Sequence, residues 1–323
     1  MNSKSNDEGS AKDVMCCANC GKAGVDDIKL KNCTACKLVK YCSVECQKNH
    51  WKQHKKACKK RAAEIREDRL FRQPEGTHLG ECPICCLPLP LHESEKKMNP
   101  QCPINTCCSK RICGGCAHAN YLHEREQGLE HKCPYCREPV FKTDEEQESD
   151  IKKRIKANDP VALCEMGSKY YVEGDHEGAV RYFKKAAGLG DIEAHFLLSG
   201  FYDRGEGVEK DMKKYVYHLE EAAIGGHPKA RHNLGCKEVM ESERMDRALK
   251  HFIIAAKLGH ENALECVKGY FEVGAINKEV YEAALRGHQA AVDATKSTQR
   301  EEAYAFDKMY EAKERAKLRG NND

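Results

Sequence analysis

A chain of 323 residues with 40% hydrophobic residues is long enough for two or three domains with packed cores. The net charge of +3 is too small to indicate nucleic-acid binding by its overall field, and no run of about 18 apolar residues is present to span a membrane. Residues 1–13 lack the apolar core of a signal peptide, so we expect a disordered tail there and a soluble protein of the cytoplasm or nucleus.

The cysteines are concentrated in the first half of the chain. Of 21 cysteines, 18 lie at or before Cys136. In a reducing compartment, such closely spaced C-x2-C pairs indicate metal binding rather than disulfides. The other three, Cys164, Cys236 and Cys266, are isolated on predicted helices, and we interpret them as small buried side chains.

The first cysteine block contains two C-x2-C pairs, followed by a C-x3-C pair and an H-x3-C pair on a predicted helix. A spacing of four residues puts both ligands of a pair on one helical face. Gly21 can adopt the positive φ that a tight C-x2-C turn needs, and Ser43 is placed to cap the helix. The eight predicted zinc ligands are Cys17, Cys20, Cys33, Cys36, Cys42, Cys46, His54 and Cys58.

This pattern, with Trp51 shortly before the ligand His, resembles the MYND family of zinc fingers. The resemblance implies a finger over residues 14–60 that binds a short, often proline-containing peptide. It also implies two interleaved zinc ions, held by Cys17, Cys20, Cys42 and Cys46 and by Cys33, Cys36, His54 and Cys58. Cys16 and His50 are then spectators. Because both sites are closed by four ligands, the zinc would be structural.

A charged helical linker is predicted over residues 61–77, and a second cysteine block follows over residues 78–141. It contains three C-x2-C pairs and, between the first two of them, the adjacent cysteines Cys107 and Cys108. The cysteines of the three pairs are Cys82, Cys85, Cys113, Cys116, Cys133 and Cys136.

The second block resembles a RING finger, in which two zinc ions are cross-braced. The resemblance implies one ion at Cys82, Cys85, Cys113 and Cys116, and a second at Cys133 and Cys136 with two more ligands. A RING has Cys-x-His at that place, whereas this chain offers Cys107 and Cys108. Possible substitutes are Cys102, His118, His123 and His131. A module with a single zinc ion, or a partly collapsed relic of the fold, is the alternative.

Active RING ligases dock a ubiquitin-conjugating enzyme on an apolar residue of the first pair and a Pro of the last. A cation after the last Cys contacts ubiquitin. Ile84, Pro134 and Arg137 occupy these places. The aromatic residue common before the last pair is missing, so ligase activity stays open.

A charged linker is predicted over residues 142–158, and a repeat begins at Asp159. The segments AAGLG, AAIGG, AAKLG and AALRG start at Ala186, Ala222, Ala255 and Ala283. Each unit is predicted to be a helix, a turn and a second helix, in which small Ala allows close crossing and Gly ends the second helix. Four stacked pairs share a continuous core that one pair cannot form.

The second unit resembles SEL-one-like repeats, relatives of the tetratricopeptide family, with Gly205, Gly207, Val208 and Asp211 in the inter-helix loop. The resemblance implies a solenoid with a concave face over residues 159–300, before a C-terminal helix and tail over 301–323. The predicted fold is therefore multidomain: two small zinc-stabilised modules followed by an all-α helical-repeat solenoid.

The leading functional interpretation is a protein-interaction adaptor that binds proteins or short peptides. One alternative is a RING-type ubiquitin ligase whose repeats select the substrate. A nucleic-acid-associated regulator is a third interpretation, although its basic helix face lacks interleaved aromatics except Trp51. That face comprises Lys48, Lys52, Lys55, Lys56, Lys59, Lys60 and Arg61. No motif of a small-molecule enzyme is found.

Overall fold

The computed structural model describes residues 16–24, 29–91, 104–140, 143–240 and 244–320, the last ten of these by their backbone alone. The chain forms two compact units, Met1–Arg72 and Gln73–Asp323. Among the helices in the described ranges, none carries an apolar stretch long enough to cross a bilayer.

The first unit is a short hairpin followed by one long helix. Strands β1 (Lys31–Asn32) and β2 (Lys40–Tyr41) pair antiparallel, and helix α1 spans Val44–Leu70. The Ser43 side chain accepts a hydrogen bond from the Cys46 N–H, which confirms the predicted cap. Because α1 continues past residue 60, the ligand helix and the predicted linker helix are a single helix.

The second unit begins with the second cysteine block. Strands β3 (Ile104–Asn105) and β4 (Lys110–Arg111) form an antiparallel hairpin, and helix α2 (Gly114–Glu126) follows at once. The predicted charged linker contains helix α3 (Asp144–Lys156), which has acidic residues in its first turn and basic residues in its last. That charge order complements the helix dipole, so this segment is helical although it buries little.

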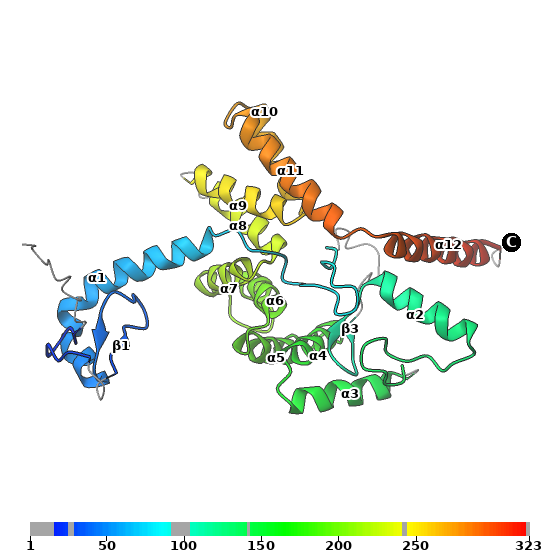
Figure 1. Cartoon of the computed structure of the whole chain (residues 1–323), viewed down its shortest axis with the longest axis horizontal. Helices are drawn as coiled ribbons and strands as arrows, with labels where there is room; N and C mark the ends of the chain where they lie inside the picture. Colours follow the sequence, from blue (N-terminus) through cyan, green and yellow to red (C-terminus); the bar gives the residue numbers. More distant parts are fainter. Residues whose placement is uncertain (1–15, 25–28, 92–103, 141–142, 241–243, 321–323) are drawn as a thin grey trace, which may run out of the picture. The chain divides into compact units, whose positions relative to one another are not determined.

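The repeat region consists of four successive helix pairs, each in contact with the next (Figure 1). Alanines at the helix crossings, among them Ala186, Ala222 and Ala255, are fully buried, as predicted from the repeat. The eight helices are α4 (Pro160–Val172), α5 (His176–Gly188), α6 (Ile192–Arg204), α7 (Met212–Ile224), α8 (Pro228–Met240), α9 (Met245–Lys257), α10 (Glu261–Glu272) and α11 (Lys278–Ala294).

The loop between α6 and α7 has the conformation that its sequence predicts. Gly205 ends α6 with a φ of 73°, and Asp211 caps α7 by accepting backbone N–H hydrogen bonds. A Cβ atom on Gly207 would lie 2.5 Å from the backbone of His176, so glycine allows this loop to touch the preceding pair.

The first helices of the pairs begin with two kinds of cap. Asp159 and Asp191 accept N–H hydrogen bonds through carboxylate oxygens, whereas His227 and His260 do so through Nδ1. A histidine that accepts at Nδ1 must be neutral, and this ties the cap to the pH.

We expect the His260 cap to make folding pH-dependent. Burial, with help from the charges of His232 and Lys229, lowers the pKa of His260 from 6.5 to about 4. The unfolded chain therefore binds a proton that the folded chain excludes, and the free energy of unfolding falls as the pH drops from 6.5 towards 4. His260→Asn keeps a capping oxygen that does not titrate. Between pH 7 and pH 5, its free energy of unfolding should therefore fall by about 1–2 kcal/mol less than that of wild type.

Urea unfolding of both full-length proteins at the two pH values measures this difference. Protonation of the zinc ligands affects both proteins equally and cancels in the comparison. An equal loss of stability in the two proteins would contradict the assignment.

One prediction from the repeat is wrong. Gly287 was expected to end the second helix of the last pair, but α11 runs through it to Ala294. A Cβ atom on Gly287 would lie 2.6 Å from Cγ of Lys257 on α9, so this glycine serves close helix packing rather than termination. His288, the next residue, is buried within α11.

The C-terminal helix α12 spans Thr298–Gly320 and packs against α2 of the second cysteine block (Figure 1). The ring of Phe306 lies 4.6 Å from that of His118 on α2. Two segments nearly 200 residues apart in the sequence therefore form one packed structure. The sequence predicted the helix but not this contact.

Candidate metal centres

The predicted ligands lie in four groups of four, and within each group all the ligand atoms are within 4.8 Å of one another. The groups are Cys17, Cys20, Cys42 and Cys46; Cys33, Cys36, His54 and Cys58; Cys82, Cys85, Cys113 and Cys116; and Cys107, Cys108, Cys133 and Cys136. The groups in the first unit are interleaved along the chain, because the first and third ligand pairs form one group and the second and fourth pairs form the other.

The sulfur separations fit tetrahedral zinc. With Zn–S bonds of about 2.3 Å, a tetrahedron has edges of about 3.8 Å, whereas a disulfide bond is about 2.05 Å long. The observed separations are 3.6 Å for Cys20 and Cys42, 3.7 Å for Cys33 and Cys58, 3.7 Å for Cys85 and Cys113, and 3.9 Å for Cys108 and Cys133. Three donor sets consist of four thiols and one of three thiols and an imidazole, which are the ligands that zinc prefers.

The only histidine in these groups is His54, whose Nε2 lies 3.1 Å from Sγ of Cys36. Its ring stacks on that of His50, and His50 Nδ1 lies 3.1 Å from the hydroxyl of Tyr41. His50 therefore supports the ligand from outside the group. Cys16 is exposed and also lies outside it.

Each C-x2-C pair that forms a turn has the next residue in the left-handed region. The N–H of that residue donates to the carbonyl of the first Cys at 2.9–3.0 Å. Gly21 has a φ of 71°, as expected, but the other turns use non-glycine residues, which adopt this conformation at a cost of about 1 kcal/mol. These are Lys37, Cys86 and Arg137.

In the first group, the pKa values of neighbouring thiols are shifted in opposite directions. Burial acts to raise the pKa of Cys17, but N–H groups of Cys20 and Cys42 outweigh it and lower the pKa to about 6. The neighbouring Cys46 raises the pKa of Cys42 to about 12. A divalent cation would replace the thiol protons, so metal affinity should fall as the pH falls.

Family comparisons agree with the geometry of the first two groups. Residues 17–58 match the family model of the MYND finger. The chain contains a MYND finger. This assignment implies that the first unit binds zinc. Residues 161–191, 192–227 and 228–260 match the Sel1 repeat, so the first three helix pairs are Sel1 repeats.

Two curated relatives match only short segments. A SET and MYND domain-containing protein of Dictyostelium discoideum is 46% identical over 52 residues, which are 15% of this chain and 10% of the relative. HcpC of Helicobacter pylori, a candidate beta-lactamase by its name, is 43% identical over 56 residues, 17% of this chain and 19% of the relative. The chain thus spans less than a fifth of either relative.

Two solved structures are similar to parts of the chain. A Sel1 repeat protein from Oxalobacter formigenes is 27% identical, with a TM-score of 0.35, over 38% of this chain and 97% of the other. The protective antigen c5321 of uropathogenic Escherichia coli, which has an SLR fold, is 23% identical, with a TM-score of 0.38, over 58% of this chain and 38% of the other.

Beyond the MYND finger, the second cysteine block gathers Cys107 and Cys108 into its second group. Both precede Ser109, whose φ of 56° closes the turn between β3 and β4, and Cys107 Sγ lies 3.4 Å from Cys136 Sγ. The proposed substitutes His118, His123 and His131 lie outside the groups, and Cys102 lies outside the described residues. Adjacent cysteines can share a group here because a tight hairpin turn carries them.

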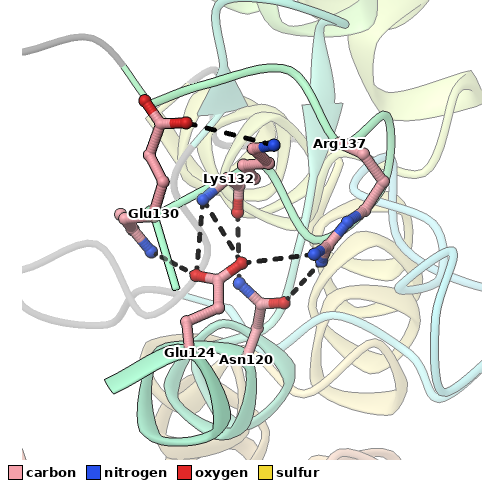
Figure 2. Close-up of polar contacts among 6 residues, drawn as sticks. Asn120, Glu124, Glu130, Lys132 and Arg137 are labelled. Carbon is pink, nitrogen blue, oxygen red and sulfur yellow. Dashed lines mark hydrogen bonds and ion pairs between the residues drawn. The ribbon is translucent and has the colours of Figure 1, made fainter. Parts of the chain in front are cut away.

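A buried carboxylate, missed by the sequence analysis, fixes the last C-x2-C pair to α2. Glu124 is 1% exposed, and it accepts hydrogen bonds from His131 Nδ1 at 2.8 Å and from the N–H of Lys132 at 3.3 Å. Arg137 Nη2 lies 3.5 Å from the same carboxylate, and Arg137 Nη1 donates to Asn120 at 2.9 Å (Figure 2). Burial alone would raise the pKa of Glu124, but the bonds from His131 and Lys132 lower it.

Replacing this carboxylate should destabilise the second cysteine block. Glu124→Ala removes charge-assisted hydrogen bonds from His131 and Lys132 and the ion pair with Arg137, and it should lower the free energy of unfolding by about 2–3 kcal/mol. Urea unfolding of the zinc-loaded chain measures the loss. Glu126→Ala, at an exposed position of the same helix, is the matched control. Equal stabilities of the two variants would show that the network in Figure 2 contributes little.

A fifth cluster, His78, Glu193 and His227, also has metal-ligand types. His227 Nδ1 accepts from the Ala230 N–H, so its proton is on Nε2, which lies 3.4 Å from Glu193. His78 Nε2 lies 3.0 Å from the same oxygen. Burial would raise the pKa of Glu193, but these two histidines lower it. Because His227 Nε2 has no free lone pair, the cluster is a hydrogen-bonded anchor between the second cysteine block and the repeats.

Proposed function

We propose that the protein is a zinc-dependent adaptor, in which the MYND finger binds one partner and the Sel1 repeats bind another. The observation that carries the proposal is that each of the four ligand groups supplies a full set of four ligands. A zinc ion held by four protein ligands has no coordination position for water or substrate. Metal in these sites would shape binding surfaces and would not catalyse a reaction.

The proposal includes four zinc ions, two in the MYND finger and two in the RING-like second block. The four sets of sulfur and nitrogen atoms described above support this number. Thiol ligands stay reduced in the cytoplasm and nucleus, and we place the protein there.

The MYND finger exposes apolar side chains beside its ligands. Leu38 is 56% exposed, Val44 68% and Trp51 41%. A proline ring can stack on an indole, and exposed apolar groups favour a peptide with proline and aliphatic residues. These side chains form the surface on which we expect such a peptide.

Trp51 is the only Trp in the chain, so its fluorescence reports on this finger alone. Full-length, zinc-loaded protein is screened against proline-containing peptides, and a peptide that binds should shift the Trp51 emission. Leu38→Ala should weaken binding, while Val172→Ala, at a position 85% exposed in the repeats, should leave it unchanged. If the zinc-loaded protein binds no peptide more strongly than the zinc-stripped protein does, the proposal is wrong.

A second partner site is supported by a cavity of about 820 Å³ along the first helices of the repeats. Its lining includes Glu165, Phe196 and Asn233 from successive pairs, together with His78 from the second cysteine block. Side chains from three pairs converge there, which is how solenoid proteins build an extended binding surface.

A RING-type ubiquitin ligase is the second candidate, favoured by one observation. Ile84 and Tyr135, inside the first and last C-x2-C pairs, are 42% and 47% exposed. Helix α12 contacts α2 through Gly115 and His118, while Asn120 and Glu124 face the last pair, so α12 packs on a different side of α2. The expected docking surface is therefore not covered by α12.

Ubiquitination assays with a panel of conjugating enzymes test this candidate. Ile84→Ala should abolish ubiquitin transfer, and Leu129→Ala, at a position 54% exposed in the same block, should not. No activity with any conjugating enzyme would eliminate the ligase and leave the adaptor.

A further inference from the structure

The first turn of α12 places Arg300 against the third ligand group, Cys82, Cys85, Cys113 and Cys116. The guanidinium Nη2 lies 3.4 Å from Sγ of Cys85 and donates to the Leu87 carbonyl at 3.2 Å. Its Nη1 donates to the carbonyls of Pro88 at 2.7 Å and Thr295 at 2.6 Å. One side chain thus joins the turn of the first C-x2-C pair to the start of α12.

The backbone of α12 approaches the other half of the same group. A Cβ atom on Gly115 would lie 2.9 Å from the backbone nitrogen of Arg300 and 3.0 Å from the carbonyl carbon of Gln299. The Gln299 side chain lies 3.9 Å from Sγ of Cys116. Only glycine at position 115 permits this approach, so the contact with the ligand group does not depend on the Arg300 side chain alone.

The charge of this group explains why a cation there matters. Four thiolates and one Zn²⁺ carry a net charge of −2, and the sulfurs of Cys82, Cys113 and Cys116 are buried. A guanidinium within hydrogen-bond reach of a thiolate lowers the cost of holding that negative charge away from water. Residues that hydrogen-bond to metal ligands also fix the ligand geometry.

We propose that Arg300 is a positioning residue of the third zinc site, so that the C-terminal helix is part of the RING-like module. The inference rests on the proposed zinc content of that module. Arg300 neutralises and orients the thiolate of Cys85, and the packing of α12 on Gly115 holds Arg300 in place. Loss of either contact weakens zinc binding at this site and leaves the two MYND sites unchanged.

The test is zinc release from the full-length protein to a chromogenic chelator, with native mass spectrometry to count the retained ions. Arg300→Gln should weaken zinc binding at the third site by about 10- to 100-fold, as is usual when a partner of a metal ligand is removed. Arg300→Lys keeps the positive charge but not the planar guanidinium group, so its zinc affinity at the third site should lie between those of wild type and Arg300→Gln. Arg286→Gln, at a position whose side chain is 70% exposed, is the matched control.

Gly115→Ala provides a second variant, because it displaces α12 while Arg300 stays intact. It should also accelerate release of one zinc ion, and unchanged circular dichroism from the repeats would show that the fold is kept. If the protein holds four zinc ions and all variants release them as slowly as wild type, the proposed role of Arg300 is refuted, while the zinc content of the RING-like module stands. A wild-type protein with only two zinc ions would refute the zinc content of the RING-like module, and this inference with it.

Discussion

Removal of zinc should unfold the MYND finger while the helical repeats remain folded. The core of the first unit consists of ligand cysteines and Tyr41, with only partly buried aliphatic side chains around them. Without metal, those thiols lose the ions that hold them together. Structural zinc sites contribute on the order of 10 kcal/mol, more than so small a core can supply by itself.

A strong chelator added to the full-length protein tests this expectation. The fluorescence of Trp51 should shift as α1 loses its attachment, and proteolysis should cut between residues 16 and 58 first. The helical signal from α4–α11 should persist, and zinc should restore the Trp51 signal. An intact finger after complete zinc removal would contradict the expectation.

The substitution Phe183→Ala should lower the free energy of unfolding of the repeats by about 3–5 kcal/mol, because it leaves a cavity in a packed core. Phe183 is 1% exposed, its ring contacts that of Phe201, and it belongs to the same buried cluster as Leu163 and Leu198. A Cβ atom on Gly167 would lie 2.6 Å from its ring, so the ring fills the space that this glycine leaves.

Urea unfolding followed by circular dichroism measures the effect. Tyr171→Ala is the control, since Tyr171 is 46% exposed on the neighbouring helix and its loss creates no cavity. The control should lose less than about 1 kcal/mol. A loss at Phe183 no greater than at Tyr171 would mean that this core is not close-packed.

The same arrangement of small and large residues recurs in the Sel1 repeats and could be found in the sequence only in retrospect. Gly167 faces Phe183 in the first repeat and Gly235 faces Phe252 in the third, while Ser199 and Leu219 hold these positions in the second. The fourth pair has Lys268 and the 37% exposed Val280 there. The fourth pair therefore lacks the small and large residues of the repeat. This explains why the solenoid has four pairs but only three of them match the Sel1 repeat.

The spacing of the cysteines allowed the ligand groups to be anticipated because the geometry is local. A C-x2-C turn directs two sulfurs to one point, and the i, i+4 spacing of His54 and Cys58 on α1 does the same. The prediction that Cys42 and Cys46 share a helical face is wrong, because α1 begins at Val44 and Cys42 precedes its cap.

The sequence could not decide whether Cys107 and Cys108 or other residues complete the fourth group, because the answer depends on the turn between β3 and β4. His131 illustrates this limit: it is near the last pair in sequence, yet it hydrogen-bonds to Glu124.

Contacts between distant segments were beyond the reach of sequence patterns. Arg300 was predicted only as the last residue of the repeat region, and Glu124 received no predicted role, because charged residues usually face solvent. Their roles depend on α12 packing on α2 and on the last C-x2-C pair folding back over α2. Neither arrangement leaves a periodic signal.

Native mass spectrometry of the reduced, full-length protein tests the central claim most directly. Sixteen side chains in four closed groups should retain four zinc ions per chain, two of which remain when Cys82 and Cys133 are both replaced by serine. A folded wild-type chain that carries no zinc, or one whose mass shows these cysteines joined in disulfides, would contradict the account.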